Sequence, residues 1–165
     1  MHDFIEPTDV AQGLAAYQRL SSEGLEEELF ADFMVFCWQA VDPGRVAALD
    51  LDDDVVDACA DQLSDLLILV DQRCQEWGAP AFWKRYIEWA DLAVELSVEE
   101  CKKFMIQNPR YLEPAFFVFL ATDGKEMRPE AMLLLSICSK STSMRSVYVR
   151  SVIESRLRTE SMGRP

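Results

Sequence analysis

Apolar residues recur every three or four positions along most of the chain, which is the spacing of helices that bury one face. The clearest repeat runs from about residue 52 to residue 77. Its apolar positions are Val56, Cys59, Leu63, Leu66, Val70, Cys74 and Trp77. In its middle, the run 66–70 is apolar all round, as expected of a helix that several neighbours cover. We therefore predict 52–77 as the central helix of an all-helical domain.

Polar residues mark both ends of this predicted helix. Asp52 can cap its first turn, and Asp53 and Asp54 lie where the positive end of the helix dipole favours carboxylates. Gly78 and Pro80 stop the helix, because glycine suits a helix C-terminus and proline cannot continue one. These signals agree with the apolar periodicity.

The same periodicity divides the rest of the chain into shorter helices. The predicted helices are residues 8–22, 25–41, 81–96, 97–107, 112–121, 129–140 and 144–159. Pro43-Gly44 is expected to form a turn, followed by a short helical piece through Leu49. The aromatic run 116–119 would also suit a strand, but its helical surroundings favour a short buried helix. We predict one all-α domain over residues 1–165, a compact bundle of about seven or eight helices, with residues 1–7 and 160–165 frayed.

Composition supports a globular chain outside membranes. Of the 165 residues, 50% are apolar and 27% are charged, which is typical of folded domains. No apolar run approaches the roughly 20 residues that cross a bilayer, and the acidic start lacks the basic-then-apolar order of a secretory signal. The five cysteines contain no CxxC pair and lie mostly on apolar helix faces. They indicate reduced, buried thiols in a cytoplasmic protein.

The net charge of −13 is unevenly distributed. Residues 1–100 carry 23 acidic and 5 basic side chains, whereas residues 101–165 carry 6 acidic and 11 basic ones. Such an asymmetry bears on partners and association rates more than on the fold. It also allows the simpler interpretation of an acidic protein whose two parts partly neutralise each other.

The sequence lacks the usual signs of an active site. His2 is the sole histidine, and the chain has no GxSxG, GxxxxGK[ST] or GxGxxG motif. The acidic run 50–61 follows the spacing of a calcium loop only superficially, because Val55 stands where the loop needs glycine. Acids four residues apart, as in Glu28/Asp32 and Asp57/Asp61/Asp65, usually form a solvated helix face. We expect a non-enzymatic protein without a metal or cofactor.

The basic last helix is a second candidate surface, for RNA or an anionic membrane. It carries Arg145, Arg150, Arg156 and Arg158 beside an apolar side. The net charge of −13 disfavours non-specific binding to phosphates, so direct nucleic-acid binding is not expected. We predict instead that these arginines pair with acids of the N-terminal part.

The remaining hypothesis is an acidic surface that binds a basic protein. Aromatic residues such as Trp38 or Phe36 could anchor the complex if they are exposed. The predicted partner-binding residues are Glu26, Glu27, Glu28, Asp32, Trp38, Asp53, Asp54, Asp57 and Asp61. An inhibitor or immunity-type protein would neutralise a toxin, an effector or a nucleic-acid enzyme in this way. Two alternatives stay open: an adaptor or secretion chaperone with an apolar groove near Trp38 or Trp83, and a metal-dependent all-α hydrolase that uses helical carboxylates.

Overall fold

Nine helices make up the part of the chain that the computed structural model describes, which is residues 9–22, 24, 26–73 and 78–162. They are α1 (Val10–Ser22), α2 (Glu27–Ala40), α3 (Pro43–Leu49), α4 (Asp53–Arg73), α5 (Gly78–Leu92), α6 (Val98–Gln107), α7 (Pro114–Ala121), α8 (Arg128–Cys138) and α9 (Met144–Met162). These ranges contain no strand, so the all-α prediction is confirmed. The predicted frayed terminus 1–7 and the last residues of the helix predicted over 52–77, residues 74–77, lie outside the described residues. Residues 160–162, predicted to fray, continue α9.

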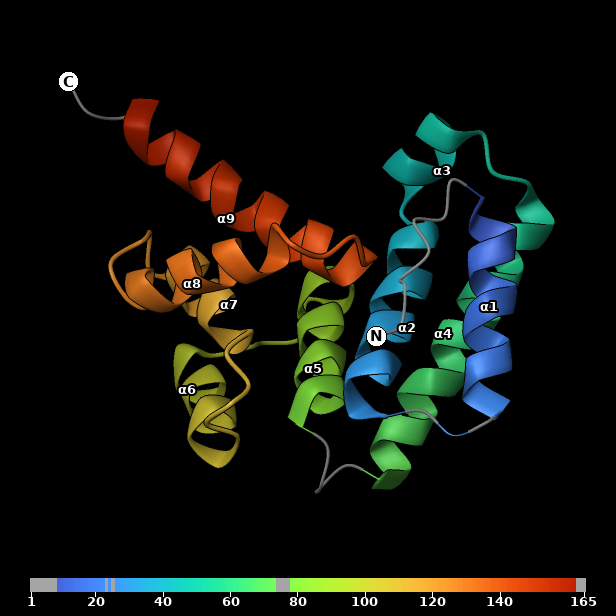
Figure 1. Cartoon of the computed structure of the whole chain (residues 1–165), viewed down its shortest axis with the longest axis horizontal. Helices are drawn as coiled ribbons and strands as arrows, with labels where there is room; N and C mark the ends of the chain where they lie inside the picture. The colour runs from blue at the N-terminus through green and yellow to red at the C-terminus, as the bar shows by residue number, and fades with distance from the viewer. Residues whose placement is uncertain (1–8, 23, 25, 74–77, 163–165) are drawn as a thin grey trace.

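The centre of the fold is occupied by α2, not by the helix predicted over 52–77. Ten of the residues of α2 are buried, and it packs against α1, α3, α4, α5 and α9 (Figure 1). By contrast, α4 buries a single face, and Ile68 and Leu69 from its apolar middle are exposed. An apolar run shows that a helix is apolar on more than one side, but it does not show how many other helices pack against it.

Local signals located most helix ends correctly. Asp9 Oδ1 accepts a hydrogen bond from the Ala11 amide at 2.9 Å, and Ser97 Oγ accepts one from the Glu100 amide at 3.1 Å. The exception is α5, which was expected to reach residue 96 and ends at Leu92. Ala93 has a φ of 54°, and a residue in the left-handed region terminates a helix. The chain then turns inward, so that Leu96 is buried.

The aromatic segment α7 is the short buried helix that its surroundings favoured. Six of its residues are buried, and α6, α8 and α9 pack around it. The turn after it closes on Gly124, whose amide donates to the Phe119 carbonyl at 2.8 Å. Its φ of 77° suits glycine, and a Cβ at this position would collide with the carboxylate of Glu160.

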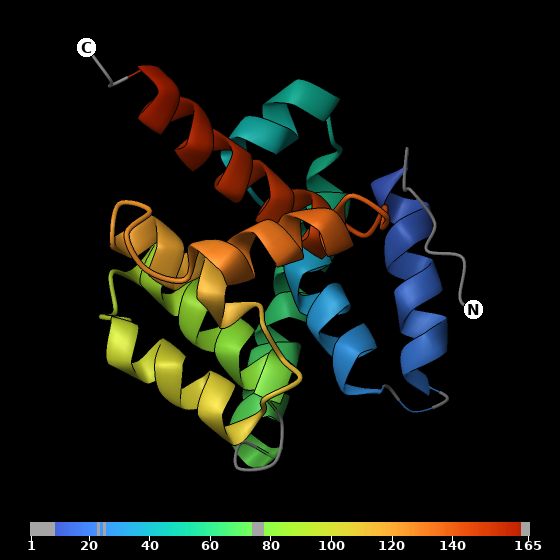
Figure 2. The same cartoon turned by 60° about the vertical axis from the view of Figure 1, so that its left-hand side comes forward.

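The two differently charged parts of the sequence lie on opposite sides of the molecule. In Figure 1, α1 to α4 occupy one side and α6 to α9 the other, with α5 between them. The view turned by 60° again places α1 and α6 at opposite sides (Figure 2). The charge asymmetry along the chain is therefore an asymmetry in space. Among the described helices, none is long and apolar enough to cross a membrane.

Candidate functional site

The outward face of α4 carries a row of exposed carboxylates. At 100° per residue, Asp54, Asp57, Asp61 and Asp65 share one side of the helix. The opposite side holds the buried residues Cys59, Leu63, Leu66 and Val70. Asp53 is also exposed, at the edge of the row. With a rise of about 1.5 Å per residue, the row extends over roughly 16 Å.

No cation of the described chain neutralises this row. None of the carboxylates of Asp53, Asp54, Asp57, Asp61 and Asp65 takes part in an ion pair or a hydrogen bond among the described residues. Basic residues that do form ion pairs in these ranges form them elsewhere, as Lys84 does with Asp71, Arg85 with Glu100, and Lys102 with Glu126. The α4 row is thus an uncompensated negative surface. Four of the predicted partner-binding residues, Asp53, Asp54, Asp57 and Asp61, lie in it.

A small apolar patch continues the α4 face beyond its carboxylates. Ile68 and Leu69 are 52% and 38% exposed, respectively. Ile68 lies on the same side of the helix as Asp61 and Asp65. The surface therefore joins negative charge to apolar area, the combination with which charged protein interfaces gain both association rate and residence time.

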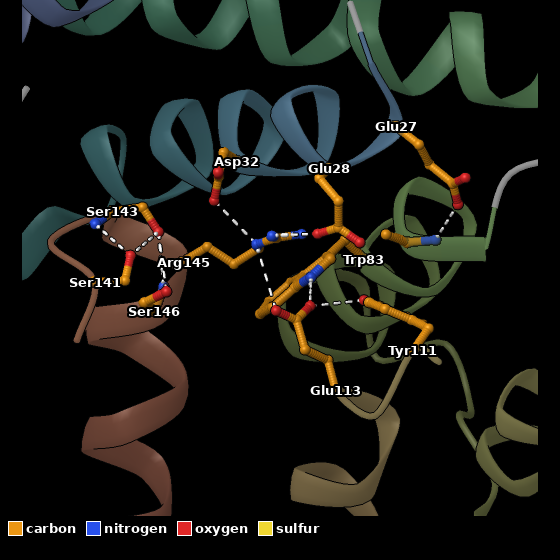
Figure 3. Close-up of polar contacts among 11 residues, drawn as sticks. Glu27, Glu28, Asp32, Trp83, Tyr111, Glu113, Ser141, Ser143, Arg145 and Ser146 are labelled. Atoms are coloured by element: carbon orange, nitrogen blue, oxygen red, sulfur yellow. Dashed lines mark hydrogen bonds and ion pairs between the residues drawn. The ribbon is translucent and has the colours of Figure 1, made fainter. Parts of the chain in front are cut away.

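Glu28 and Asp32, two of the predicted partner-binding residues, instead contact a buried arginine. Arg145, at the start of α9, is 7% exposed. Its Nη2 lies 2.6 Å from Glu28 Oε2, and its Nε lies 2.9 Å from Asp32 Oδ1 and 3.4 Å from Glu113 Oε1 (Figure 3). The Asp32 contact is an ion pair and not an aligned hydrogen bond. This confirms the predicted pairing with N-terminal acids for Arg145, but the prediction was wrong for Arg156 and Arg158, which pair with Asp123 and Glu154 of the C-terminal part.

Neutral donors complete this cluster around Glu113. Trp83 Nε1 and the Tyr111 hydroxyl donate to Glu113 Oε2 at 2.6 and 2.7 Å (Figure 3). Three carboxylates still face one guanidinium. The pKa of Asp32 is raised to about 6, chiefly because the carboxyl group is buried. The positive charge of Arg145 opposes this shift, and the negative charge of Glu113 adds to it. The cluster links α2, α5, α7 and α9, and it is a structural element of the interior.

Asp32 and Trp38 are therefore not part of the exposed acidic surface. Asp32 is 3% exposed and Trp38 is 7% exposed. Trp38 Nε1 donates to Asp91 Oδ2 at 2.8 Å, and its ring packs edge-on against Tyr148 at a centroid distance of 5.0 Å. The expectation that Trp38 or Phe36 anchors a partner is not supported by their positions, because Phe36 is also buried. The fold covers both faces of α2, so no aromatic side of it is left for a partner.

Glu27 and Glu28 line a shallow pocket of about 410 Å³ with the segment from Gln107 to Tyr111. Each also has an internal contact. Glu27 Oε1 accepts a hydrogen bond from the Ala79 amide at 2.8 Å, near the start of α5. The Glu28 side chain remains 64% exposed beside Arg145. Glu26, the third predicted glutamate, is exposed.

Neither set of helical carboxylates is arranged to hold a metal. The described residues contain no group of three histidine, cysteine, aspartate or glutamate side chains with the geometry of a metal site. Around Glu28 and Asp32, the guanidinium of Arg145 takes the place where a bound cation would lie. Asp57, Asp61 and Asp65 point away from the fold as a solvated face.

Sequence reasoning predicted that Arg145 pairs with N-terminal acids, but it missed that Arg145 is buried and that Glu113 contacts it. A signal for its burial was present. Arg145, Val149 and Ile153 are spaced by four, and the latter two are fully buried. An arginine at the first position of a buried stripe is expected to need a carboxylate partner. No local pattern, however, showed which acids would reach it.

The chain matches no protein-family model, and no curated protein or solved structure is significantly similar to it. Its function is therefore argued from the geometry above.

Proposed function

We propose that this chain is a non-enzymatic acidic protein that acts in the cytoplasm and neutralises a basic partner protein. The partner would be a toxin, an effector or a nucleic-acid enzyme. The observation that carries the proposal is the α4 row: its five carboxylates are exposed and have no cationic partner among the described residues. A positively charged surface would supply the missing charge.

The contrast with the other carboxylates supports this interpretation. Carboxylates that serve the fold are paired, as Asp32 and Glu113 are with Arg145. Like charges along one helix face repel one another and give nothing to stability. A partner with lysines and arginines would relieve this repulsion, and the long-range field would speed the encounter. Ile68 and Leu69 would add apolar contact at the end of the row.

The binding surface that we propose differs in part from the sequence prediction. It consists of Asp53, Asp54, Asp57, Asp61 and Asp65, with Ile68 and Leu69. Glu26, Glu27 and Glu28 lie outside this surface and would contribute at most a flanking contact; Glu27 and Glu28 line the shallow pocket described above. We do not propose the alternative of an apolar groove near Trp38 or Trp83, because Trp83 is fully buried and Trp38 is 7% exposed.

The test is affinity capture from the native lysate by the tagged chain, with a low-salt wash, a high-salt elution and mass spectrometry of the eluate. The double variant Asp57→Asn/Asp61→Asn removes two charges from the row. Glu95→Gln/Glu99→Gln is its matched control, because it removes two exposed charges outside α4. We expect a basic protein that salt releases, that the α4 variant binds at least about tenfold more weakly, and that the control retains. Equal binding by both variants would refute the proposed surface.

A further inference from the structure

The shallow pocket beside Glu27 and Glu28 is lined by side chains of opposite charge. Glu27 and Glu28 belong to the first turn of α2. The segment 107–111, which runs from the last residue of α6 into the turn after it, lines the same pocket and carries Arg110. The pocket volume of about 410 Å³ lies within the roughly 300–1,000 Å³ of small-molecule sites.

Internal hydrogen bonds hold the lining of this pocket in place. Glu27 Oε1 accepts a hydrogen bond from the Ala79 amide at 2.8 Å. The Tyr111 amide donates to the Asn108 carbonyl at 2.9 Å, and the Tyr111 hydroxyl donates to Glu113 Oε2 at 2.7 Å (Figure 3). The pocket is therefore largely preformed, as small-molecule sites usually are.

The acidic part of the pocket keeps a negative charge although Arg145 lies beside it. Glu28, Asp32 and Glu113 share this one guanidinium, so the carboxylates outnumber the cation. The Glu28 side chain also remains 64% exposed. Glu27 forms no ion pair among the described residues. The potential near Glu27 and Glu28 therefore favours an ammonium group.

Arg110 supplies an unpaired positive charge to the same pocket. It is exposed and forms no ion pair or hydrogen bond among the described residues, so it is not paired with Glu27 or Glu28. A guanidinium binds carboxylates through its planar set of N–H donors. The glutamates would repel an anion, and Arg110 would repel a cation. A molecule that carries both an ammonium group and a carboxylate satisfies both charges.

We propose that this pocket binds a small zwitterion with an apolar side chain, of the class of free apolar amino acids or short peptides. The ammonium group of the ligand would contact Glu27 and Glu28, and its carboxylate would contact Arg110. Pro109 and Tyr111, which also line the pocket, would contact the apolar side chain. This inference does not depend on the proposed function, which concerns the α4 row.

The test is a titration of the isotope-labelled chain, followed by NMR at the backbone amides within 107–111. The probes are L-leucine and glycyl-leucine, and the tighter binder shows whether the ligand is a free amino acid or a peptide. We expect saturable shifts with a Kd between about 10 µM and about 1 mM. Leucinamide lacks the carboxylate and N-acetylleucine lacks the ammonium group, so each should bind at least about tenfold more weakly than L-leucine.

Matched variants test the role of Arg110. Arg110→Gln should weaken the binding of L-leucine at least about tenfold and leave that of leucinamide unchanged, because leucinamide has no carboxylate to lose a contact. Lys103→Gln is the control, since Lys103 is an exposed cation of α6 that does not line the pocket. It should bind L-leucine as the wild type does. Circular dichroism confirms that both variants are folded.

Three results would overturn the proposal. The first is the absence of shifts within 107–111 at about 20 mM L-leucine and about 20 mM glycyl-leucine. The second is leucinamide binding as tightly as L-leucine, which would assign the pocket to cations such as a lysine side chain of another protein. The third is an Arg110→Gln variant that binds L-leucine as tightly as the wild type does.

Discussion

Arg145 Nε lies 2.9 Å from Asp32 Oδ1 in the interior of the protein, and less than a tenth of either side chain is exposed. This contact joins the first turn of α9 to α2. Glu28 and Glu113 also contact the guanidinium. Asp32, which the sequence analysis assigned to a partner-binding surface, is therefore part of the core.

Arg145→Met should destabilise the protein by about 3–5 kcal/mol, because it leaves Asp32 and Glu113 buried without a counter-charge. Urea unfolding at neutral pH measures the loss. Arg150→Met is the control, since Arg150 lies on the same helix without an ion pair among the described residues. It should change the free energy of unfolding by well under 1 kcal/mol. Equal losses for both variants would contradict a special role for the Arg145 cluster.

The pKa of Asp32, which burial raises to about 6, predicts a pH dependence of stability. The unfolded chain ionises Asp32 near pH 4, so between about pH 4 and pH 6 unfolding releases a proton. The contribution of Asp32 is therefore fully present below pH 4 and is lost as the pH rises through about 6. Relative to Asp32→Asn, the wild type should lose on the order of 2–3 kcal/mol over this window.

Urea titrations of the wild type and Asp32→Asn from about pH 4 to about pH 7 measure this difference. The exposed Asp61 serves as a control, because Asp61→Asn should leave the pH slope of the wild type nearly unchanged. If the wild type instead became more stable relative to Asp32→Asn as the pH rises, the effect of Arg145 on the pKa of Asp32 would outweigh that of burial.

Trp38→Phe should lower the free energy of unfolding by about 1–3 kcal/mol, since it removes the hydrogen bond to Asp91 and part of a buried ring. The same variant should bind the basic partner as the wild type does, because Trp38 is not on the surface. Paired measurements of unfolding and partner affinity separate the two effects. Loss of affinity in a variant of unchanged stability would restore Trp38 as an anchor.

The buried thiols should resist modification in the native protein. Cys37, Cys59, Cys101 and Cys138 are each at most 3% exposed, and burial raises the pKa of Cys101 to about 12. In the Cys74→Ser variant these four remain. We expect Ellman's reagent to react with none of them rapidly in buffer and with all of them in concentrated urea. A fast phase in buffer would show that one of the four thiols becomes accessible without unfolding.

The helices themselves could be predicted because their signals are local. The periodicity of α4 separated its buried positions from Asp54, Asp57 and Asp61, and the structure places them on opposite sides. Caps at Asp9 and Ser97 have side-chain oxygens within hydrogen-bonding distance of amides two or three residues away. A short stretch of chain contains all the atoms that decide such features.

The exposure of the candidate site residues was predicted only in part. On α4, one apolar face makes the opposite face solvent-exposed, and the carboxylate row follows. On α2, nearly every position is apolar, so periodicity has no exposed side to point to. Asp32 and Trp38 therefore looked as available as Asp57, although both are buried.

The sequence by itself determined the all-α class, most helix ends, the asymmetry of charge and the solvated face of α4. The tertiary structure alone decided that α2 is the central helix, that Arg145 collects Glu28, Asp32 and Glu113, and that Glu28 and Arg110 line the same pocket. The physical reason is range. Helix formation and capping depend on residues within one or two turns, whereas burial and ion pairing depend on which distant segments share the same space, as Arg145 and Glu28 do across 117 positions.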